Sequence, residues 1–252
     1  MIKPFQVKKA LALIFDLLYL NILLHYFQVI FFSPFIRVVN YHDIPPDEAD
    51  QFERHMQYYI KNYSSVLYED LIQFHEQRQW HKTKPGLIIS FDDGHSSFYE
   101  IVAPLLEKYG FTGWFFIPVG LIDVNIKDQY QSAIDHRIFS KTNKHDSSKI
   151  FLTWNQILEL DKNHVIGCHT LSHQRLCSTL TEKQLYEEIN FSKQMLEQKL
   201  LHEVKTFAWV GGEESSYSNI AAKAIRIANY EVVFQTNNSI IKPSTNLFNI
   251  DR

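Results

Sequence analysis

Two short motifs carry the side chains that bind metal ions and move protons in enzymes. The stretch LIISFDDG places the adjacent carboxylates Asp92 and Asp93 directly after an apolar run. Further along the chain, the stretch HTLSH places His169 and His173 four residues apart. One Asp and two His make an open three-ligand site for Zn²⁺ or a similar divalent ion, which leaves positions for water and substrate. Because neighbouring residues of an extended chain point in opposite directions, one Asp can bind the ion while the other faces the substrate.

Each motif also has a purely structural interpretation. Asp-Asp-Gly is typical of a turn that closes a strand, and a His-x-x-x-His pair occurs by chance on surface helices. The two motifs together favour a metal site when both lie at the ends of strands. The prediction therefore depends on the elements that carry them.

Length and composition indicate one large globular domain. The 252 residues are 45% hydrophobic and 21% charged, and a chain of this length is sufficient for an α/β barrel. The formal net charge is -3 with the 12 His counted as neutral, so the chain lacks the basic surface that nucleic-acid binding requires. Cys168 and Cys177 are the only cysteines and provide no disulfide framework. Cys168 directly precedes His169 on a predicted strand, so we expect it to point away from the pocket, into the core.

After residue 35, the hydrophobic pattern alternates between strands and helices. The predicted strands span 36–42, 65–68, 85–91, 112–118, 164–169, 205–210, 230–236 and 247–251. The predicted helices span 47–63, 69–79, 97–110, 153–162, 180–201 and 218–229, with Thr153 and Thr181 as N-caps. Residues 123–149 are polar and irregular, which predicts a loop or insertion over one end of the fold. About eight strands separated by helices predict an α/β barrel or a doubly wound sheet.

In both folds the binding pocket lies at the carboxyl ends of the parallel strands. The residues at the predicted strand ends are Tyr41, His42, Asp43, Asp92, Asp93, Pro118, His169, Val210, Gly211, Gly212 and Gln235. Acidic and imidazole side chains are therefore concentrated at one end of the predicted sheet. This convergence predicts a metal site more strongly than either motif does alone.

Residues 1–35 differ from the rest of the chain, and we expect an apolar helical segment that anchors the protein to a membrane. The run from Val7 to Phe35 is rich in Leu, Ile, Phe and Tyr, and its length suits one membrane span of about 20 residues. No small-residue cleavage site follows it, so a removed signal peptide is not expected. An amphipathic helix in the membrane plane and a soluble packing helix stay open, because polar residues interrupt the run at Asp16, Asn21, His25 and Gln28.

Three lysines, Lys3, Lys8 and Lys9, precede or open this apolar run. If the helix spans a membrane, the lysines would keep the N-terminus in the cytoplasm and send the remaining chain across. The expected location is therefore membrane-associated, with the domain over 36–252 on the periplasmic or extracellular side. The cytoplasmic face of the membrane is the alternative.

Five motifs follow one another along the chain: VVNYH, ISFDDG, FLTWNQILEL, IGCHTLSH and FAWVGG. Together they resemble the polysaccharide deacetylases of carbohydrate esterase family 4, and the resemblance extends from Ile36 to Arg252. It implies a distorted (β/α) barrel and the metal-dependent removal of N-acetyl groups from an amino-sugar glycan. The chain is thus expected to be a carbohydrate de-N-acetylase that acts on a surface or envelope polysaccharide.

The same resemblance implies a role for each site residue. Asp93, His169 and His173 would hold the divalent metal, with Zn²⁺ as the expected ion. Asp92 would be the general base that takes a proton from the metal-bound water, which is the nucleophile. The backbone N–H of Gly211 would donate a hydrogen bond to the oxyanion that forms on the acetyl carbonyl.

Two positions depart from the family pattern. Val210-Gly211-Gly212 stands where the family usually has Pro and an aromatic residue before the Gly, which keeps a backbone donor but removes a rigid wall. Many members also carry a catalytic His near the end of the domain, whereas here no His follows Asn246, and the final stretch NLFNIDR resembles the Arg-bearing last strand of other members. His42, at another strand end, is the candidate general acid; a metal-bound water or a residue of the 123–149 insertion is the alternative. His95 is expected at the rim or in solvent.

Two other functions stay open from the sequence. The chain could be a non-catalytic glycan-binding or assembly protein built on a deacetylase scaffold, which the altered turn at Gly211 and the missing terminal His favour. A different metal hydrolase on a similar barrel is the third hypothesis. The complete set of Asp92, Asp93, His169 and His173 argues for the deacetylase.

Overall fold

The structure is a computed structural model that describes Leu23, Phe27 and residues 34–138, 149–211, 216, 218–237 and 239–252. The apolar helical segment predicted over 1–35 therefore lies outside the described residues, except for Leu23, Phe27 and its last two residues. Leu23 and Phe27 are helical and exposed. Within the described ranges, no helix has both the length and the apolar character needed to cross a bilayer.

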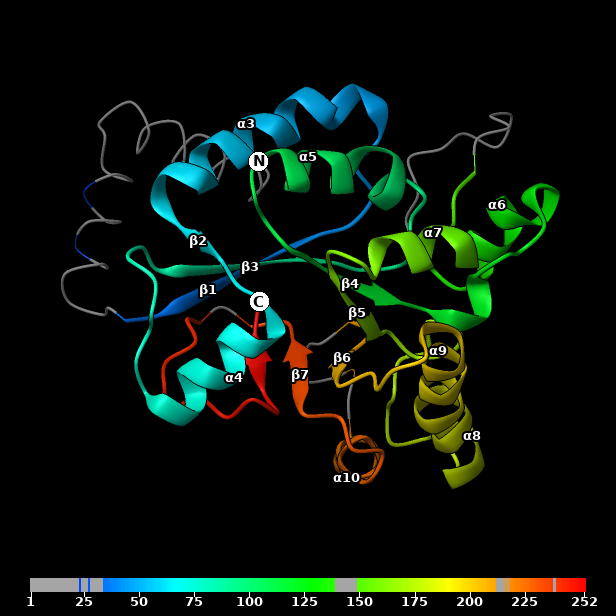
Figure 1. Cartoon of the computed structure of the whole chain (residues 1–252). Coiled ribbons are helices and arrows are strands. Elements are labelled where there is room, and N and C mark those ends of the chain that lie inside the picture. The colour runs from blue at the N-terminus through cyan, green and yellow to red at the C-terminus, as the bar shows by residue number, and fades with distance from the viewer. Residues whose placement is uncertain are drawn as a thin grey trace, which may run out of the picture.

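Eight parallel strands form the sheet at the centre of the described structure (Figure 1). They are β1 (Ile36–Tyr41), β2 (Ser64–Ser65), β3 (Gly86–Phe91), β4 (Gly113–Ile117), β5 (Val165–Cys168), β6 (Thr206–Ala208), β7 (Val232–Gln235) and β8 (Ile250–Asp251). Their order in the sheet is β1-β3-β4-β5-β6-β7-β8, and the short β2 pairs with the first residues of β3. The parallel pairing places the carboxyl ends of all these strands at one end of the sheet.

The two edges of this sheet approach each other, so the sheet is a nearly closed barrel. Ile36 in β1 and Ile241, between β7 and β8, exchange backbone hydrogen bonds of 3.0 and 2.7 Å. Arg252, which follows β8, donates a hydrogen bond of 3.3 Å to Asn40 in β1. These contacts bring together residues from the two ends of the described domain. The predicted distorted (β/α) barrel is confirmed.

Helices connect the strands and pack around the barrel (Figure 1). They are α3 (Ala49–Asn62), α4 (Tyr68–Gln77), α5 (Ala103–Lys108), α6 (Ile126–Asp135), α7 (Trp154–Leu160), α8 (Glu182–Tyr186), α9 (Ser192–Leu200) and α10 (Asn219–Ile227). The described ranges also contain four short segments: the 3-10 helices η1 (Pro46–Glu48) and η3 (Val119–Leu121) and the π-helical turns η2 (Phe98–Val102) and η4 (Glu187–Phe191). The two predicted N-caps are confirmed, because Thr153 and Thr181 cap α7 and α8.

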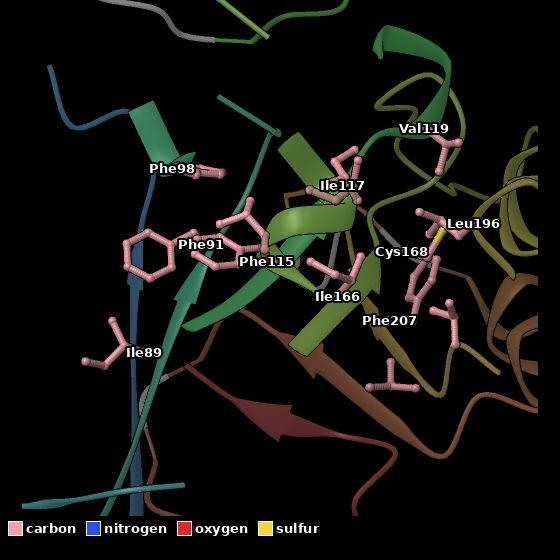
Figure 2. Close-up of a cluster of buried hydrophobic side chains, with 14 of the residues drawn as sticks. Ile89, Phe91, Phe98, Phe115, Ile117, Val119, Ile166, Cys168, Leu196 and Phe207 are labelled. Atoms are coloured by element: carbon pink, nitrogen blue, oxygen red, sulfur yellow. The ribbon is translucent and has the colours of Figure 1, made fainter. Parts of the chain in front are cut away.

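Alternate residues of the strands face two separate cores. The outer core lies between the strands and the helices, and Figure 2 shows part of it, including Ile89, Phe91, Phe115, Ile117, Ile166, Cys168 and Phe207. The inner core contains the intervening residues Ile88, Trp114, Phe116, Ala208 and Phe234. Cys168 is fully buried in the outer core, as predicted, so the next residue, His169, faces the inside of the barrel.

The segment predicted to be irregular over 123–149 contains a helix. In α6, the side chain of Asn125 accepts a hydrogen bond from the N–H of Lys127, and Gln129 and Ala133 are buried. Oε1 of the buried Gln129 accepts the N–H of Ile150 at 2.6 Å. The prediction was wrong because the buried face of α6 includes a glutamine, whose partner lies 21 residues away and leaves no apolar period in the sequence.

Candidate active site and metal centre

The inward-facing residues of β3 lead directly to the first acid. Ile88 belongs to the inner core, and Asp92 lies four residues later, on the same face of the extended chain. The next two residues turn the chain with positive φ angles, +78° at Asp93 and +67° at Gly94. Glycine adopts this conformation without strain, and Asp tolerates it better than most residues. The turn therefore directs two adjacent carboxylates to two different places.

Asp93, His169 and His173 form one cluster. One ligand atom from each side chain lies within 4.8 Å of the others. Oδ1 of Asp93 is 3.6 Å from Nε2 of His169 and 3.1 Å from Nε2 of His173. Among the described residues, this buried oxygen has no hydrogen-bond partner. A buried carboxylate oxygen without a partner is costly, and a divalent ion between the three ligand atoms would satisfy it.

Backbone carbonyls orient both imidazole rings. Nδ1 of His169 donates to the carbonyl oxygen of Ala208 at 2.8 Å, and Nδ1 of His173 donates to the carbonyl oxygen of His136 at 2.7 Å. Since Nδ1 carries the proton in each bond, Nε2 keeps its lone pair for an ion. Metal-binding histidines usually donate their second nitrogen in this way. One carboxylate and two such imidazoles fit Zn²⁺ or a similar ion.

Burial and nearby charge determine the ionisation of these groups. Burial alone would raise the pKa of Asp93, but its contacts with His173 and His95 hold that pKa well below the usual value. Burial lowers the pKa of His169 to about 4, so this ring is neutral near pH 7. Burial also acts to lower the pKa of His173, but the hydrogen bond and charge of Asp93, together with the hydrogen bond to the carbonyl of His136, raise it. An incoming metal ion would therefore compete with a proton on His173.

Asp92 belongs to a separate buried cluster. Both terminal nitrogens of Arg252 donate to its carboxylate, one to each oxygen, at 2.6 Å. Nδ2 of Asn40 donates to Oδ2 of Asp92 at 3.0 Å. Burial alone would raise the pKa of Asp92, but the charge and the hydrogen bonds of Arg252 lower it below the usual value. Asp92 is therefore ionised near neutral pH and held in one orientation.

A cavity of about 720 Å³ opens over both clusters. All six site residues predicted from the sequence line it: Asp92, Asp93, His169, His173, His42 and Gly211. His42 is exposed. Gly211 has a φ of +81°, and its carbonyl oxygen accepts a hydrogen bond of 2.7 Å from Thr236. The structure thus brings the predicted residues together at the carboxyl ends of the strands.

His95 does not lie where the sequence placed it. It is 1% exposed, and its Nε2 lies 3.8 Å from Oδ2 of Asp93. The expectation of a rim or solvent position was wrong because the chain around Phe151 covers this loop. The N–H of Leu152 donates to the carbonyl of Gly94 at 2.9 Å, and residues 95 and 151 form a short antiparallel bridge.

The partners of Asp92 were not among the site residues predicted from the sequence. Asn40 and Ser90 stand at paired positions of β1 and β3, and Oγ of Ser90 donates to Oδ1 of Asn40 at 2.9 Å. Both are polar residues within apolar strands, which was the available signal, because a buried polar side chain needs a partner. Arg252 was recognised only as part of a final strand. Its pairing with Asp92 spans 160 residues and has no local signature.

The fold and the site define an α/β barrel with a candidate metal centre and a buried Asp–Arg pair at the carboxyl ends of its strands. The family model of polysaccharide deacetylases matches residues 81–233, which is more than half of the chain. The chain therefore belongs to the polysaccharide deacetylase family. No curated protein sequence matches it.

Solved deacetylase structures share the fold over most of their length. Streptococcus pyogenes deacetylase PplD in complex with acetate matches with a TM-score of 0.67 and 20% identity, over 86% of this chain and 91% of that one. IcaB from Ammonifex degensii matches with a TM-score of 0.67 and 18% identity, over 87% and 91%. A de-N-acetylase from Aggregatibacter actinomycetemcomitans matches with a TM-score of 0.66 and 16% identity, over 86% and 94%. At these identities the similarity shows the fold.

Proposed function

We propose that this chain is a metal-dependent de-N-acetylase that removes N-acetyl groups from a glycan of N-acetylated amino sugars. The observation that carries the proposal is the separation of two adjacent buried carboxylates at one cavity. Asp93 faces Nε2 of two imidazoles, whereas Asp92 is bound by Arg252. Membership of the polysaccharide deacetylase family supports the class of reaction.

Asp93, His169 and His173 would hold the divalent ion, and Zn²⁺ suits this donor set. When bound, the ion would polarise the acetyl carbonyl and lower the pKa of a water molecule. Three protein ligands would leave room at the ion for the acetyl group and for a water molecule. The protein supplies the remaining steps from residues on the walls of the same cavity.

Asp92 would act as the general base. Oδ2 accepts from both Arg252 and Asn40, whereas Oδ1 accepts only from Arg252 and keeps a lone pair. Oδ1 would take a proton from the water that attacks the acetyl carbon. Because Arg252 lowers the pKa of Asp92, the carboxylate is a weak base. The step therefore requires a water molecule of lowered pKa. Asp92 is therefore expected to act as a base only when the metal site is filled.

Gly211 would act on the carbonyl oxygen of the amide, and His42 would act on its nitrogen. The N–H of Gly211 donates a hydrogen bond to the carbonyl oxygen as negative charge develops on it. His42 donates a proton to the amide nitrogen as the C–N bond breaks. The products are acetate and a sugar with a free amine.

Acetate release from N-acetylglucosamine oligomers tests this proposal. Protein loaded with Zn²⁺ is expected to release acetate, to lose activity after treatment with a chelator, and to recover when Zn²⁺ is added back. The variant His173→Ala should not recover, because one ligand is missing. Wild-type protein that binds Zn²⁺ tightly but releases no acetate from any N-acetylated glycan would contradict the proposal and favour a glycan-binding or assembly role.

We also propose that residues 1–35 hold the protein at a membrane, with the deacetylase domain on the periplasmic or extracellular side. The apolar run and the lysines around its start support this location. The full chain, expressed in bacteria, is expected to sediment with membranes and to resist extraction with alkaline carbonate. Digestion by protease added to intact spheroplasts would report the side of the membrane. Recovery of the full chain in the soluble fraction would contradict the proposal.

A further inference from the structure

The loop that carries both imidazole ligands has an unfavourable backbone conformation. Three residues, 170–172, connect His169 to His173. The φ angle is +69° at Thr170 and +57° at His173, which lies in the left-handed region. This conformation costs free energy in residues other than glycine and persists only where the surroundings impose it. The contacts of the loop therefore decide how well the two ligands are placed.

The segment after β4 holds one side of this loop. The N–H of Val119 donates to the carbonyl of Thr170 at 3.2 Å, and the N–H of Gly120 donates to the carbonyl of Leu171 at 2.7 Å. The two chains are in close contact, because a Cβ atom at Gly120 would lie 2.8 Å from the carbonyl oxygen of Leu171. These two bonds satisfy carbonyl groups of the loop.

Glu188 satisfies the amides of the loop from the other side. Its Oε2 accepts the N–H groups of Leu171 and Ser172, both at 3.0 Å. Its Oε1 accepts the hydroxyl of Ser172 at 2.6 Å. The side chain is buried, with 9% of the residue exposed. All three donors lie between the two imidazole ligands, so one buried side chain holds the loop that carries both.

The π-helical turn η4 places Glu188 at this point. Such a turn lacks the usual helical bonds, and side chains here satisfy the carbonyl groups that it leaves. Oγ of Ser192 lies 2.7 Å from the carbonyl oxygen of Glu188, and the hydroxyl of Tyr230 donates to the carbonyl of Ile189 at 3.3 Å. Ser192 also contacts Sγ of Cys168 at 3.1 Å, which links the turn to the strand residue before the first ligand. Single π turns are frequent at functional sites.

We propose that Glu188 is a positioning residue of the metal centre, which holds the loop so that His169 and His173 present Nε2 to Asp93. The inference rests on the proposed metal-dependent function. Without Glu188, two amides of a tightly packed loop lose their acceptor, and the loop can relax from its left-handed conformation. Ion binding must then restore the conformation, and the ion binds more weakly.

The Zn²⁺ affinity of the full chain, measured by competition with a chelating indicator, tests the inference. Glu188→Ala is expected to weaken binding by about 10–100-fold, the usual effect of removing a partner that orients metal ligands. Glu188→Gln is expected to bind nearly as well as the wild type. Its amide oxygen can accept both N–H groups, and the hydroxyl of Ser172 can accept from its NH₂ group. Glu188→Asp keeps the charge but is one methylene shorter, so an intermediate loss is expected.

Two control variants separate positioning from general stability. Glu187→Ala alters the neighbouring, exposed carboxylate of the same turn. Asp70→Ala removes another buried carboxylate, 7% exposed, which accepts the N–H of Leu67 at 2.8 Å at the start of α4. Asp70→Ala is expected to lower the melting temperature and to leave Zn²⁺ affinity unchanged. The visible absorption spectrum of bound Co²⁺ should change in Glu188→Ala and in neither control.

Several results would overturn the inference. One is a Glu188→Ala protein with wild-type Zn²⁺ affinity and a wild-type Co²⁺ spectrum. Another is high affinity in Glu188→Asp with loss in Glu188→Gln, because charge would then matter more than the reach of the hydrogen bonds. This second comparison decides the question if Glu188→Ala does not fold. A wild-type protein that binds no divalent ion would overturn the proposed function as well, whereas normal wild-type binding with an unaffected Glu188→Ala variant would overturn this inference alone.

Discussion

Replacing Asp92 by Asn is expected to lower the rate of acetate release by about 10²–10⁴-fold, the usual contribution of a general base. Asn has nearly the same shape as Asp but cannot take a proton from the attacking water near neutral pH. Zn²⁺ binding should persist, because Asp93 and the two His ligands are unchanged. Initial rates on N-acetylglucosamine oligomers and the Zn²⁺ content of the protein measure the two effects.

The matched control is Asp251→Asn, a change of the same type in the last strand, β8. Asp251 accepts hydrogen bonds from Gln235 at 2.9 Å and Ser239 at 2.6 Å and is absent from the cavity lining. This variant should release acetate at close to the wild-type rate. A rate for Asp92→Asn within about tenfold of the wild-type rate would be too small a loss for a general base. It would contradict the assignment of Asp92 to this role.

Replacing Arg252 by Met is expected to lower the free energy of unfolding by about 3–5 kcal/mol, which is the effect of removing one partner of a buried ion pair. Only 2% of the Arg252 side chain and 4% of the Asp92 side chain are exposed. Met fills much of the same volume above the ring of Phe116, which lies 5.5 Å from the guanidinium. The loss would therefore come from the carboxylate left buried without its cation. Urea unfolding at neutral pH measures it.

The same substitution should move the pH dependence of activity. Arg252 lowers the pKa of Asp92, so its removal raises that pKa. A general base works only when it is deprotonated. The acidic limb of the rate profile in Arg252→Met should therefore lie at higher pH than in the wild type, and activity should be lost earlier as the pH falls. An unchanged acidic limb would contradict the assignment of Asp92 as the base.

Two further variants test the origin of the stability loss. The double variant Asp92→Asn, Arg252→Met should recover part of the lost stability, because no unpaired charge stays buried. Lys205→Met breaks the more exposed pair with Glu231, whose charged atoms are 2.9 Å apart. An exposed pair contributes less than about 1 kcal/mol. If Lys205→Met and Arg252→Met lowered the free energy of unfolding equally, burial would not explain the effect of removing Arg252.

Local patterns were sufficient to predict most elements of the fold. β3 and β4 were recognisable because the runs LII and WFFI are apolar on both faces, as is typical of buried parallel strands. The N-caps Thr153 and Thr181 were recognisable because the cap and its Gln partner lie within one helical turn. Local patterns failed at α6, where the buried residue is Gln129 and its partner is distant in the sequence.

The environment of each site residue was harder to predict than its identity. His95 looked like a surface residue because it follows the Asp-Asp-Gly turn, yet the chain near Phe151 buries it. Glu188 lies in the helix predicted over 180–201, where no local feature separates it from the other acids of that helix. Glu188 meets the amides of Leu171 and Ser172 because of the π turn and because this helix packs against β5.

The sequence by itself determined the residue types of the candidate site and their positions at strand ends. Those features follow from hydrophobic alternation and short motifs, which act over a few residues. Only the tertiary structure decided which of these side chains meet. Closure of the barrel pairs Arg252 with Asp92 across 160 residues and brings His42 and Gly211 to the same cavity. The reason is physical: strand order and closure depend on packing between distant segments, which no local pattern records.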